Sequence, residues 1–346
     1  MIHRRAAEAP LELDRLLKQV SRSFYLTLRA LPRQVRPQIG LAYLLARTSD
    51  TIADTHLVPV ERRLSALRQM RAAIVNLGTG RTTLPPDFGT LAEAQAGPAG
   101  RGTSGERILL ECAGAALDAL RALGREDRQL VCEVLHTITL GQENDLARFG
   151  SADRERIRSL ATDSELEEYT YSVAGCVGEF WTRMCRAHLF PGEPLDDTVL
   201  LCDGVRFGKG LQLVNILRDM PGDLRQGRCY IPADKLAGSN LTARDLLEAK
   251  NMDRFRPLCD HYLEQAREHL AAGWRYVEAI PRNQVRVRLA CAWPVLIGMK
   301  TLSLLSKGNV LDDSQRIRVD RSAIRKLIIV SLFRYPFSAA WNRQFH

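Results

Sequence analysis

The sequence predicts an all-α protein. Apolar residues recur at helical spacing along most of its 346 residues, and segments with the two-residue alternation of strands are nearly absent. Apolar residues make up 45% of the chain, which is enough to build a sizeable core. We therefore expect one domain, residues 1–346, in which helices surround a central cavity and no internal repeat occurs.

The first half of the chain should hold helices on either side of one irregular segment. Helical periodicity predicts helices at residues 11–30, 37–55, 61–77, 106–123 and 126–148. The helix at 37–55 is apolar almost all round, so it should be buried. Residues 78–105 are rich in Gly, Pro, Thr and Ala without a period, and we expect a flexible surface loop there.

The second half should be helical as well. The same periodicity predicts helices at residues 166–188, 198–220, 256–280, 286–306 and 321–333. The first of these contains Y-T-Y-S-V-A-G-C-V-G-E-F-W, whose glycines would let a neighbouring helix or a ligand approach closely. Pro221 should kink or end the helix at 198–220, because proline removes a hydrogen bond and clashes with the preceding turn.

Charge and cysteine usage limit the classes of partner. The net charge is +9 and the isoelectric point about 9.3, which favours anionic partners such as diphosphates or an acidic membrane surface. The basic residues are dispersed and no nucleic-acid-binding motif is visible, so we expect no nucleic-acid partner. The eight cysteines are scattered without a C-x-x-C pair, which fits free thiols in a reducing cytoplasm.

The termini bear on localisation. The first ten residues lack the apolar stretch of a signal peptide, and no run of about 20 apolar residues predicts a membrane-spanning helix. Residues 327–333 are apolar and are flanked by Arg325, Lys326 and Arg334. Two interpretations stay open for this segment: peripheral association with a membrane surface, or a C-terminal helix docked on the core.

Two aspartate pairs are the most informative feature of the chain. Asp50 and Asp54, and later Asp219 and Asp223, are each spaced four residues apart, which puts both carboxylates of a pair on one helix face. A lone pair of this kind is usually a solvated helix face. Here both pairs occur on otherwise apolar helices, where an unpartnered carboxylate would be costly. Mg²⁺, which binds carboxylates together with substrate phosphates, would offset the repulsion between the carboxylates.

Arginines accompany both pairs. Arg47 precedes Asp50 by three residues, Arg218 adjoins Asp219, and Arg225 and Arg228 follow. A guanidinium fork matches phosphate oxygens in geometry and charge. Carboxylates for metal and arginines for phosphate, repeated twice, predict a cluster of Mg²⁺ ions that holds a diphosphate.

Four segments give the chain a resemblance to the squalene/phytoene synthase family, the head-to-head prenyl synthases. They are S-R-S-F at 21–24, Y-L-L-A-R-T-S-D-T-I-A-D at 43–54, Y-T-Y-S-V-A-G-C-V-G at 169–178 and Q-L-V-N-I-L-R-D-M-P-G-D-L-R-Q-G-R-C-Y-I-P at 212–232. The resemblance extends from about residue 17 to residue 310. It implies an all-α isoprenoid synthase fold, Mg²⁺ dependence and C15 or C20 prenyl diphosphate substrates.

The resemblance also implies roles for individual residues. The metal-binding positions are Asp50, Asp54, Asn215, Asp219 and Asp223, and the four aspartates are also essential to catalysis. Tyr169 falls on the catalytic tyrosine; ordinary core packing is its alternative role. The remaining matches are to substrate-binding positions, namely Ser21, Arg22, Ser23, Phe24, Tyr43, Arg47, Val173, Gln212, Arg218 and Arg228. Gly222 departs from the family pattern, which commonly has Glu there.

Three interpretations are open within the family: a squalene synthase, a dehydrosqualene or phytoene synthase, and a presqualene diphosphate synthase. A bacterial type of squalene synthase joins two farnesyl diphosphates through presqualene diphosphate and reduces the intermediate with NADPH, in isoprenoid biosynthesis leading to sterols or hopanoids. Phytoene, dehydrosqualene and presqualene diphosphate synthases omit the reduction. The resemblance to the C-A-x-P of squalene synthases, at C-A-W-P 291–294, favours squalene. Arg316 and Arg318 are candidates to bind the NADPH phosphates, with a solvated basic turn as the alternative.

A non-enzymatic role also has to be weighed. Some relatives of this fold have lost the aspartates and act as assembly factors. Because all four aspartates and the neighbouring arginines are present here, we expect an enzyme.

Overall fold

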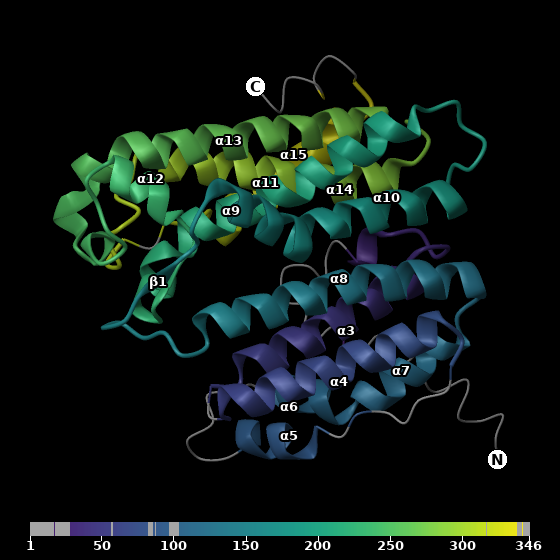
Figure 1. The fold of residues 1–346 in the computed structure, drawn as a ribbon. Coiled ribbons are helices and arrows are strands. Elements are labelled where there is room, and N and C mark those ends of the chain that lie inside the picture. The colour runs from purple at the N-terminus through teal and green to yellow at the C-terminus, as the bar shows by residue number, and fades with distance from the viewer. Residues whose placement is uncertain are drawn as a thin grey trace. The chain divides into compact units, whose positions relative to one another are not determined.

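A computed structural model describes residue 17, residues 28–56, 58–81, 86, 88–96, 104–315 and 317–337, and residue 341. The elements of these residues are helical apart from one pair of two-residue strands, so the all-α class is confirmed (Figure 1). The chain divides into two compact units, one from residues 1–150 with 183–191 and one from 151–182 with 192–346. The arrangement around a central cavity, and the single domain, stay predictions.

The first unit is built from short and long helices. They are α3 (Arg36–Asp54), α4 (Val60–Gly78), α5 (Gly89–Ala96), α6 (Ser104–Glu111), α7 (Ala113–Ala122) and α8 (Arg125–Phe149). Helices α4 and α8 lie side by side (Figure 1), and a partly buried ion pair joins them. Glu143 of α8 accepts two bonds from the Arg71 guanidinium, at 2.6 and 3.2 Å, which satisfies a carboxylate that is 7% exposed.

The second unit is built around the longest helix. Its elements are β1 (Arg158–Ser159), α9 (Asp163–Thr170), the π-helical turn η1 (Tyr171–Gly175), the start of α10 (Cys176–His188), α11 (Asp197–Arg225), β2 (Arg228–Cys229), α12 (Ala233–Gly238), η2 (Asp245–Leu247), η3 (Ala249–Asn251), α13 (Met252–Ala279), α14 (Val285–Leu305) and α15 (Arg321–Arg334). Helices α11 and α13 pack along each other, and α14 packs on both. The strands are parallel, with Arg158 opposite Arg228.

Glycines set the distance between η1–α10 and α11. A Cβ at Gly178 would lie 1.9 Å from the carbonyl oxygen of Gly204, and one at Gly208 would lie 2.2 Å from that of Ala174. Only glycine allows backbones to approach this closely. The expected role of the glycine-rich segment in close helix packing is therefore confirmed, and it fixes the helix that carries Tyr169 against the second aspartate helix.

Two expectations about irregular segments need correction. Part of the expected loop at 78–105 is helical, because Phe88, Leu91 and Ala92 are buried at helical spacing and anchor α5. The helix expected at 106–123 is interrupted at Cys112, which separates α6 from α7.

Helix α11 does not end at Pro221 but continues to Arg225. The proline lacks only one N–H donor, and the buried side chains of Met220 and Leu224 hold the final turn in place. Packing of this kind commonly outweighs local preference in helices.

One further difference concerns membrane-spanning potential. Among the described residues, α14 is long and apolar enough to cross a membrane by length and composition, but 61% of that stretch is buried inside the protein. Burial of this kind is typical of a core helix. The eight cysteines, all within the described residues, are free.

Candidate functional site

The first aspartate motif lies on the face of α3 that its own unit leaves partly exposed. Tyr43, Arg47, Asp50 and Asp54 recur at spacings of four, three and four residues, so they share this face. The opposite face is buried, and its hydroxyl groups bond back to the helix: Thr48 Oγ1, for example, donates to the carbonyl of Leu44 at 2.9 Å. The core thereby fixes which side chains α3 presents outward.

Arg47 joins the motif to a second helix. Its guanidinium donates to Asp50 and, at 3.1 Å, to Glu106 of α6. Burial by itself lowers the pKa of Arg47. The charges of Asp50, Glu106, Tyr43 and Asp54 together raise it by more, so the pKa lies above its ordinary value. Arg47 is therefore a permanent cation held beside carboxylates.

The second motif occupies one face of α11. Gln212, Asn215, Asp219 and Asp223 follow one another at three- and four-residue spacing, while Leu213, Val214, Ile216, Leu217, Met220 and Leu224 form the buried faces. The side chains expected to bind metal thus lie on a single side of this helix, as the spacing predicts. Among the described residues, a Cβ added at Gly222 would meet Arg225 Nη2 alone, at 4.0 Å, so they leave space there for a larger side chain such as glutamate.

Arg218 forms a fork on the neighbouring aspartate. Its Nε and Nη2 donate to the two carboxylate oxygens of Asp219, at 2.8 and 2.5 Å. The hydrogen bond to Asp219 raises the pKa of Arg218, burial opposes it, and the charges of Asp219 and Asp223 add to the increase. In both motifs an arginine therefore neutralises the first aspartate, Arg47 with Asp50 and Arg218 with Asp219.

Tyr169 lies beside this second motif. Its hydroxyl accepts a hydrogen bond from Gln212 Nε2 at 3.4 Å, and Asn215 Nδ2 donates to Gln212 Oε1 at the same distance. Its ring stacks on that of Tyr230, with centroids 4.6 Å apart and planes inclined by 21°. The structure thus brings three predicted residues together, Tyr169, Gln212 and Asn215.

Tyr230 was not predicted as a site residue. It follows β2 in the segment R-C-Y-I-P, and its place in that motif was the available signal. Gly227, with a φ of 80°, makes the turn that leads from α11 into β2, where Arg228 pairs with Arg158 of β1 and Tyr230 then stacks on Tyr169 of α9. Arg228 is half-buried there, and Val173 lies in the π-helical turn.

Some predicted residues lie outside this description. Ser21, Arg22, Ser23, Phe24 and Arg316 are outside the described residues. Arg318 is exposed between α14 and α15. The α3 and α11 motifs belong to different units.

The donor chemistry of both motifs fits magnesium. Carboxylate and amide oxygens are hard ligands, and Mg²⁺ binds through one or two carboxylates with substrate oxygens completing its shell. Within the described residues, no three Asp, Glu, His or Cys side chains converge as a metal site of their own. Each motif by itself offers one pair of carboxylates on one helix face, the donor type that Mg²⁺ prefers.

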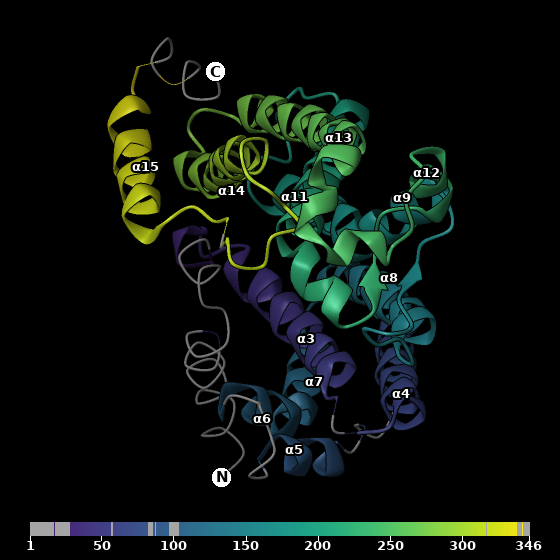
Figure 2. The ribbon, with the colours of Figure 1, turned by 90° about the vertical axis from the view of Figure 1, so that its left-hand side faces the viewer.

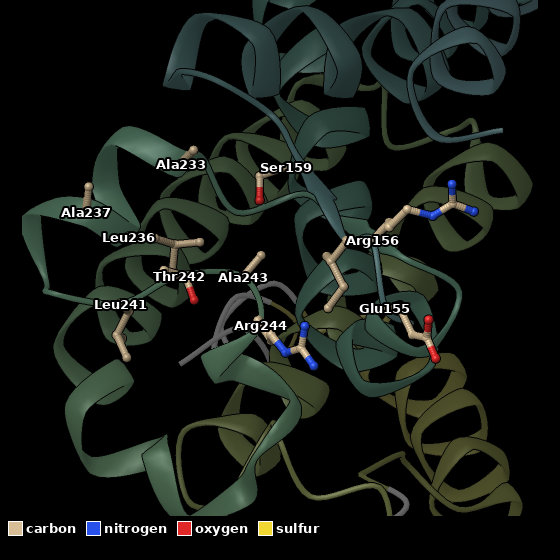
Figure 3. A pocket seen from close by; sticks show the side chains of 11 residues that line it. Glu155, Arg156, Ser159, Ala233, Leu236, Ala237, Leu241, Thr242, Ala243 and Arg244 are labelled. Carbon is tan, nitrogen blue, oxygen red and sulfur yellow. The ribbon is translucent and has the colours of Figure 1, made fainter. Parts of the chain in front are cut away.

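A pocket of about 410 Å³ lies elsewhere in the second unit, between β1, α12 and the start of η2 (Figure 3). Its wall is mainly apolar, from Ile157, Leu236 and Leu241, with Arg156 and Arg244 among its charged side chains. None of the predicted site residues lines it. Among the described residues, its lining includes the carboxylate of Glu155 but no pair of aspartates.

Comparisons with known proteins agree with these motifs. The family model for squalene/phytoene synthase matches residues 17–323. The chain is 26% identical to squalene synthase ERG9 of Saccharomyces cerevisiae over 88% of its own length and 63% of that protein. It is 30% identical to presqualene diphosphate synthase of Rhodopseudomonas palustris over 76% of its own length and 77% of that protein. The chain thus spans less than two thirds of the yeast protein.

A solved structure shows the same fold. The complex of TcSQS with the ligand BPH1237 superimposes with a TM-score of 0.77, covers 98% of this chain and 89% of that one, and shares 20% sequence identity. The isoprenoid synthase fold expected from the sequence is confirmed. The extent of the family match, together with the two aspartate motifs, shows that the chain belongs to the squalene/phytoene synthase family.

Proposed function

We propose that this protein condenses two molecules of farnesyl diphosphate head to head, through presqualene diphosphate, and then reduces that intermediate with NADPH to squalene. The observation that carries the proposal is the repeated motif, in which an aspartate pair shares a helix face with an arginine that already pairs with its first carboxylate. Similarity to a squalene synthase over 88% of the chain supports squalene as the product.

The arginine–aspartate pairs suit exchange with a substrate. In each motif one cation and two carboxylates stand on the partly exposed helix face, so Arg47 and Arg218 can bind diphosphate oxygens when the carboxylates bind metal. Mg²⁺ bound by Asp50 and Asp54, or by Asn215, Asp219 and Asp223, would act as a Lewis acid on the leaving diphosphate. The arginines would add hydrogen bonds to the same developing charge.

Tyr169 is the proposed proton-transfer residue. Stacking on Tyr230 restrains the ring of Tyr169. Its hydroxyl oxygen accepts a hydrogen bond from the Gln212 amide, so the hydroxyl can still donate its own proton to another group. Closing the cyclopropyl ring of presqualene diphosphate requires loss of one proton. We assign to Tyr169 the transfer of that proton toward the departing diphosphate.

The reductive half-reaction requires a hydride donor beside the substrate. NADPH would supply a hydride to the second carbocation, and the exposed guanidinium of Arg318 has the charge to bind its phosphates. Arg316 is proposed to act with it. We further propose that the enzyme works in the cytoplasm on farnesyl diphosphate.

Product analysis tests the proposal. The protein is incubated with farnesyl diphosphate and Mg²⁺, with and without NADPH, and the lipid products are separated. We expect presqualene diphosphate or dehydrosqualene without NADPH, and squalene with it. Replacing Arg316 and Arg318 together by alanine should raise the NADPH concentration needed for squalene and spare the first half-reaction. If no coupled product forms under any of these conditions, the assignment is wrong.

A second candidate is a presqualene diphosphate synthase, which is favoured by the 30% identity to such an enzyme over 77% of its length. An output of presqualene diphosphate that is indifferent to NADPH would establish it. A clear preference for geranylgeranyl diphosphate with a C40 product would instead indicate a phytoene synthase.

A further inference from the structure

Helix α15 turns three of its large apolar side chains away from the protein. Ile329, Leu332 and Phe333 recur at spacings of three and one residues and share one helix face, and Phe337 follows directly after the helix. Their exposed fractions are 53%, 49%, 76% and 66%, and they form the largest group among the exposed large apolar side chains of the described residues. Contiguous exposed apolar surface of this kind usually marks an interaction site.

The rotation of α15 is fixed by polar contacts on its inner side. Ser331 is fully buried, and its hydroxyl accepts a hydrogen bond from Trp293 Nε1 of α14 at 2.9 Å. At the far end, the Tyr335 hydroxyl donates to the carbonyl of Arg282 at 2.7 Å. Figure 2 shows α15 at the margin of its unit, with α14 between it and α13. The helix thus buries Ser331 and half-buries Leu327 and Ile328 on its inner side, while Phe333 stays exposed on the outer side.

Positive charge surrounds the apolar face. Arg321, Arg325, Lys326 and Arg334 are exposed on the same helix, and residues 321–337 contain no Asp or Glu. The carboxylate that directly precedes them in the chain is Asp320, which caps the helix by accepting from the Ala323 amide at 2.8 Å. An occupant of this surface must therefore be apolar at its centre and anionic around it.

We propose that the outer face of α15 binds a membrane surface that contains anionic lipids. Ile329, Leu332, Phe333 and Phe337 would enter the boundary between headgroups and acyl chains, while the four cations contact the headgroup charges. A second copy of the chain fits less well, because a symmetric contact through this face would bring its cations together with those of the other copy. This inference goes beyond the proposed reaction and does not depend on it.

Vesicle sedimentation tests the proposal on the full chain without substrate. Vesicles of phosphatidylcholine alone are compared with vesicles containing about one third phosphatidylglycerol. We expect binding to the anionic vesicles that weakens as salt is raised. Replacing Arg325 and Lys326 by glutamine should weaken binding about thirtyfold, since each cation near such a surface contributes about 1 kcal/mol.

The apolar contribution is tested separately. Phe333→Ser with Phe337→Ser should reduce binding roughly tenfold or more, because partial burial of two aromatic rings is lost. The matched control is Val199→Ser on α11, a side chain that is 55% exposed in another part of the unit. Circular dichroism confirms that each variant is folded.

Three results would overturn the proposal. The first is equal binding to neutral and anionic vesicles, and the second is unchanged binding by the Phe333/Phe337 variant. The third is a wild-type protein that sediments as a stable dimer in the absence of vesicles, while the Phe333/Phe337 variant sediments as a monomer. That result would assign the face to a second copy of the chain.

Discussion

Replacing Arg218 by alanine should remove most of the activity and little of the stability. In the structure its guanidinium donates to both oxygens of Asp219, at 2.8 and 2.5 Å. The two side chains are 35% and 52% exposed, so solvent screens their attraction. A pair of this exposure contributes about 0–1 kcal/mol to folding. Melting should therefore shift by less than about 3 °C.

The effect on catalysis should be larger. If Arg218 binds the substrate diphosphate, the variant loses charge-assisted hydrogen bonds that contribute about 1.5–3 kcal/mol. This corresponds to a decrease in kcat/KM of roughly tenfold to 150-fold. Arg218→Lys should recover only part of the loss, because lysine keeps the charge but cannot form the fork.

The assay measures kcat/KM for farnesyl diphosphate with Mg²⁺, alongside thermal unfolding by circular dichroism. Arg206→Ala is the matched control, because Arg206 lies on the same helix and also forms guanidinium hydrogen bonds, to His269 Nδ1 and to the carbonyl of Glu268, each at 3.3 Å. We expect the control to keep near-normal activity. If Arg218→Ala retains activity within twofold of the wild type, or if lysine replaces arginine fully, the assigned diphosphate contact is wrong.

Asp50→Asn, and the same change at Asp219, should each abolish turnover in Mg²⁺ while the helical circular dichroism persists; near-normal turnover would show that the carboxylate pairs do not hold the metal. Tyr169→Phe should lower kcat more than Tyr171→Phe, since the Tyr171 hydroxyl already donates to Glu179 at 3.0 Å; equal and mild losses would assign Tyr169 to packing. Burial, and then the charge of Arg206, hold the pKa of His269 below its ordinary value of 6.5. The unfolded chain therefore binds the extra proton first, so stability is complete above pH 6.5 and is lost as pH falls below it. Thermal unfolding of His269→Gln should show a smaller loss, and identical pH profiles for the two proteins would contradict this.

The sequence predicted the fold class and the long helices because their periodicity is strong and local. Helix α3 begins and ends within one residue of its expected bounds, and the spacing of its aspartates places both on the partly exposed face. The continuation of α11 through Pro221 was not predictable, because it depends on the burial of Met220 and Leu224 by other parts of the unit.

Long-range partners in the site were also beyond the sequence pattern. The contact of Arg47 with Glu106 joins residues 59 positions apart, and the stack of Tyr169 on Tyr230 joins α9 to the residue after β2. Neither follows from the spacing within a motif. The aspartates could be found because carboxylates are conspicuous on apolar helices, whereas a buried tyrosine such as Tyr230 resembles any other core aromatic.

The discontinuity of the first unit has a consequence for how the chain is made. That unit takes its last segment from residues 183–191, after the chain has entered the second unit. His188 Nε2 lies 2.6 Å from Asp127 Oδ1, and Arg183 reaches Glu133 at 3.5 Å, so these contacts tie the segment to α8. During synthesis the first 150 residues must wait for residue 191 to leave the ribosome before their unit is complete. A fragment that stops at residue 150 should therefore expose the surface of α8 and aggregate, whereas one that extends past residue 191 would supply the missing partner.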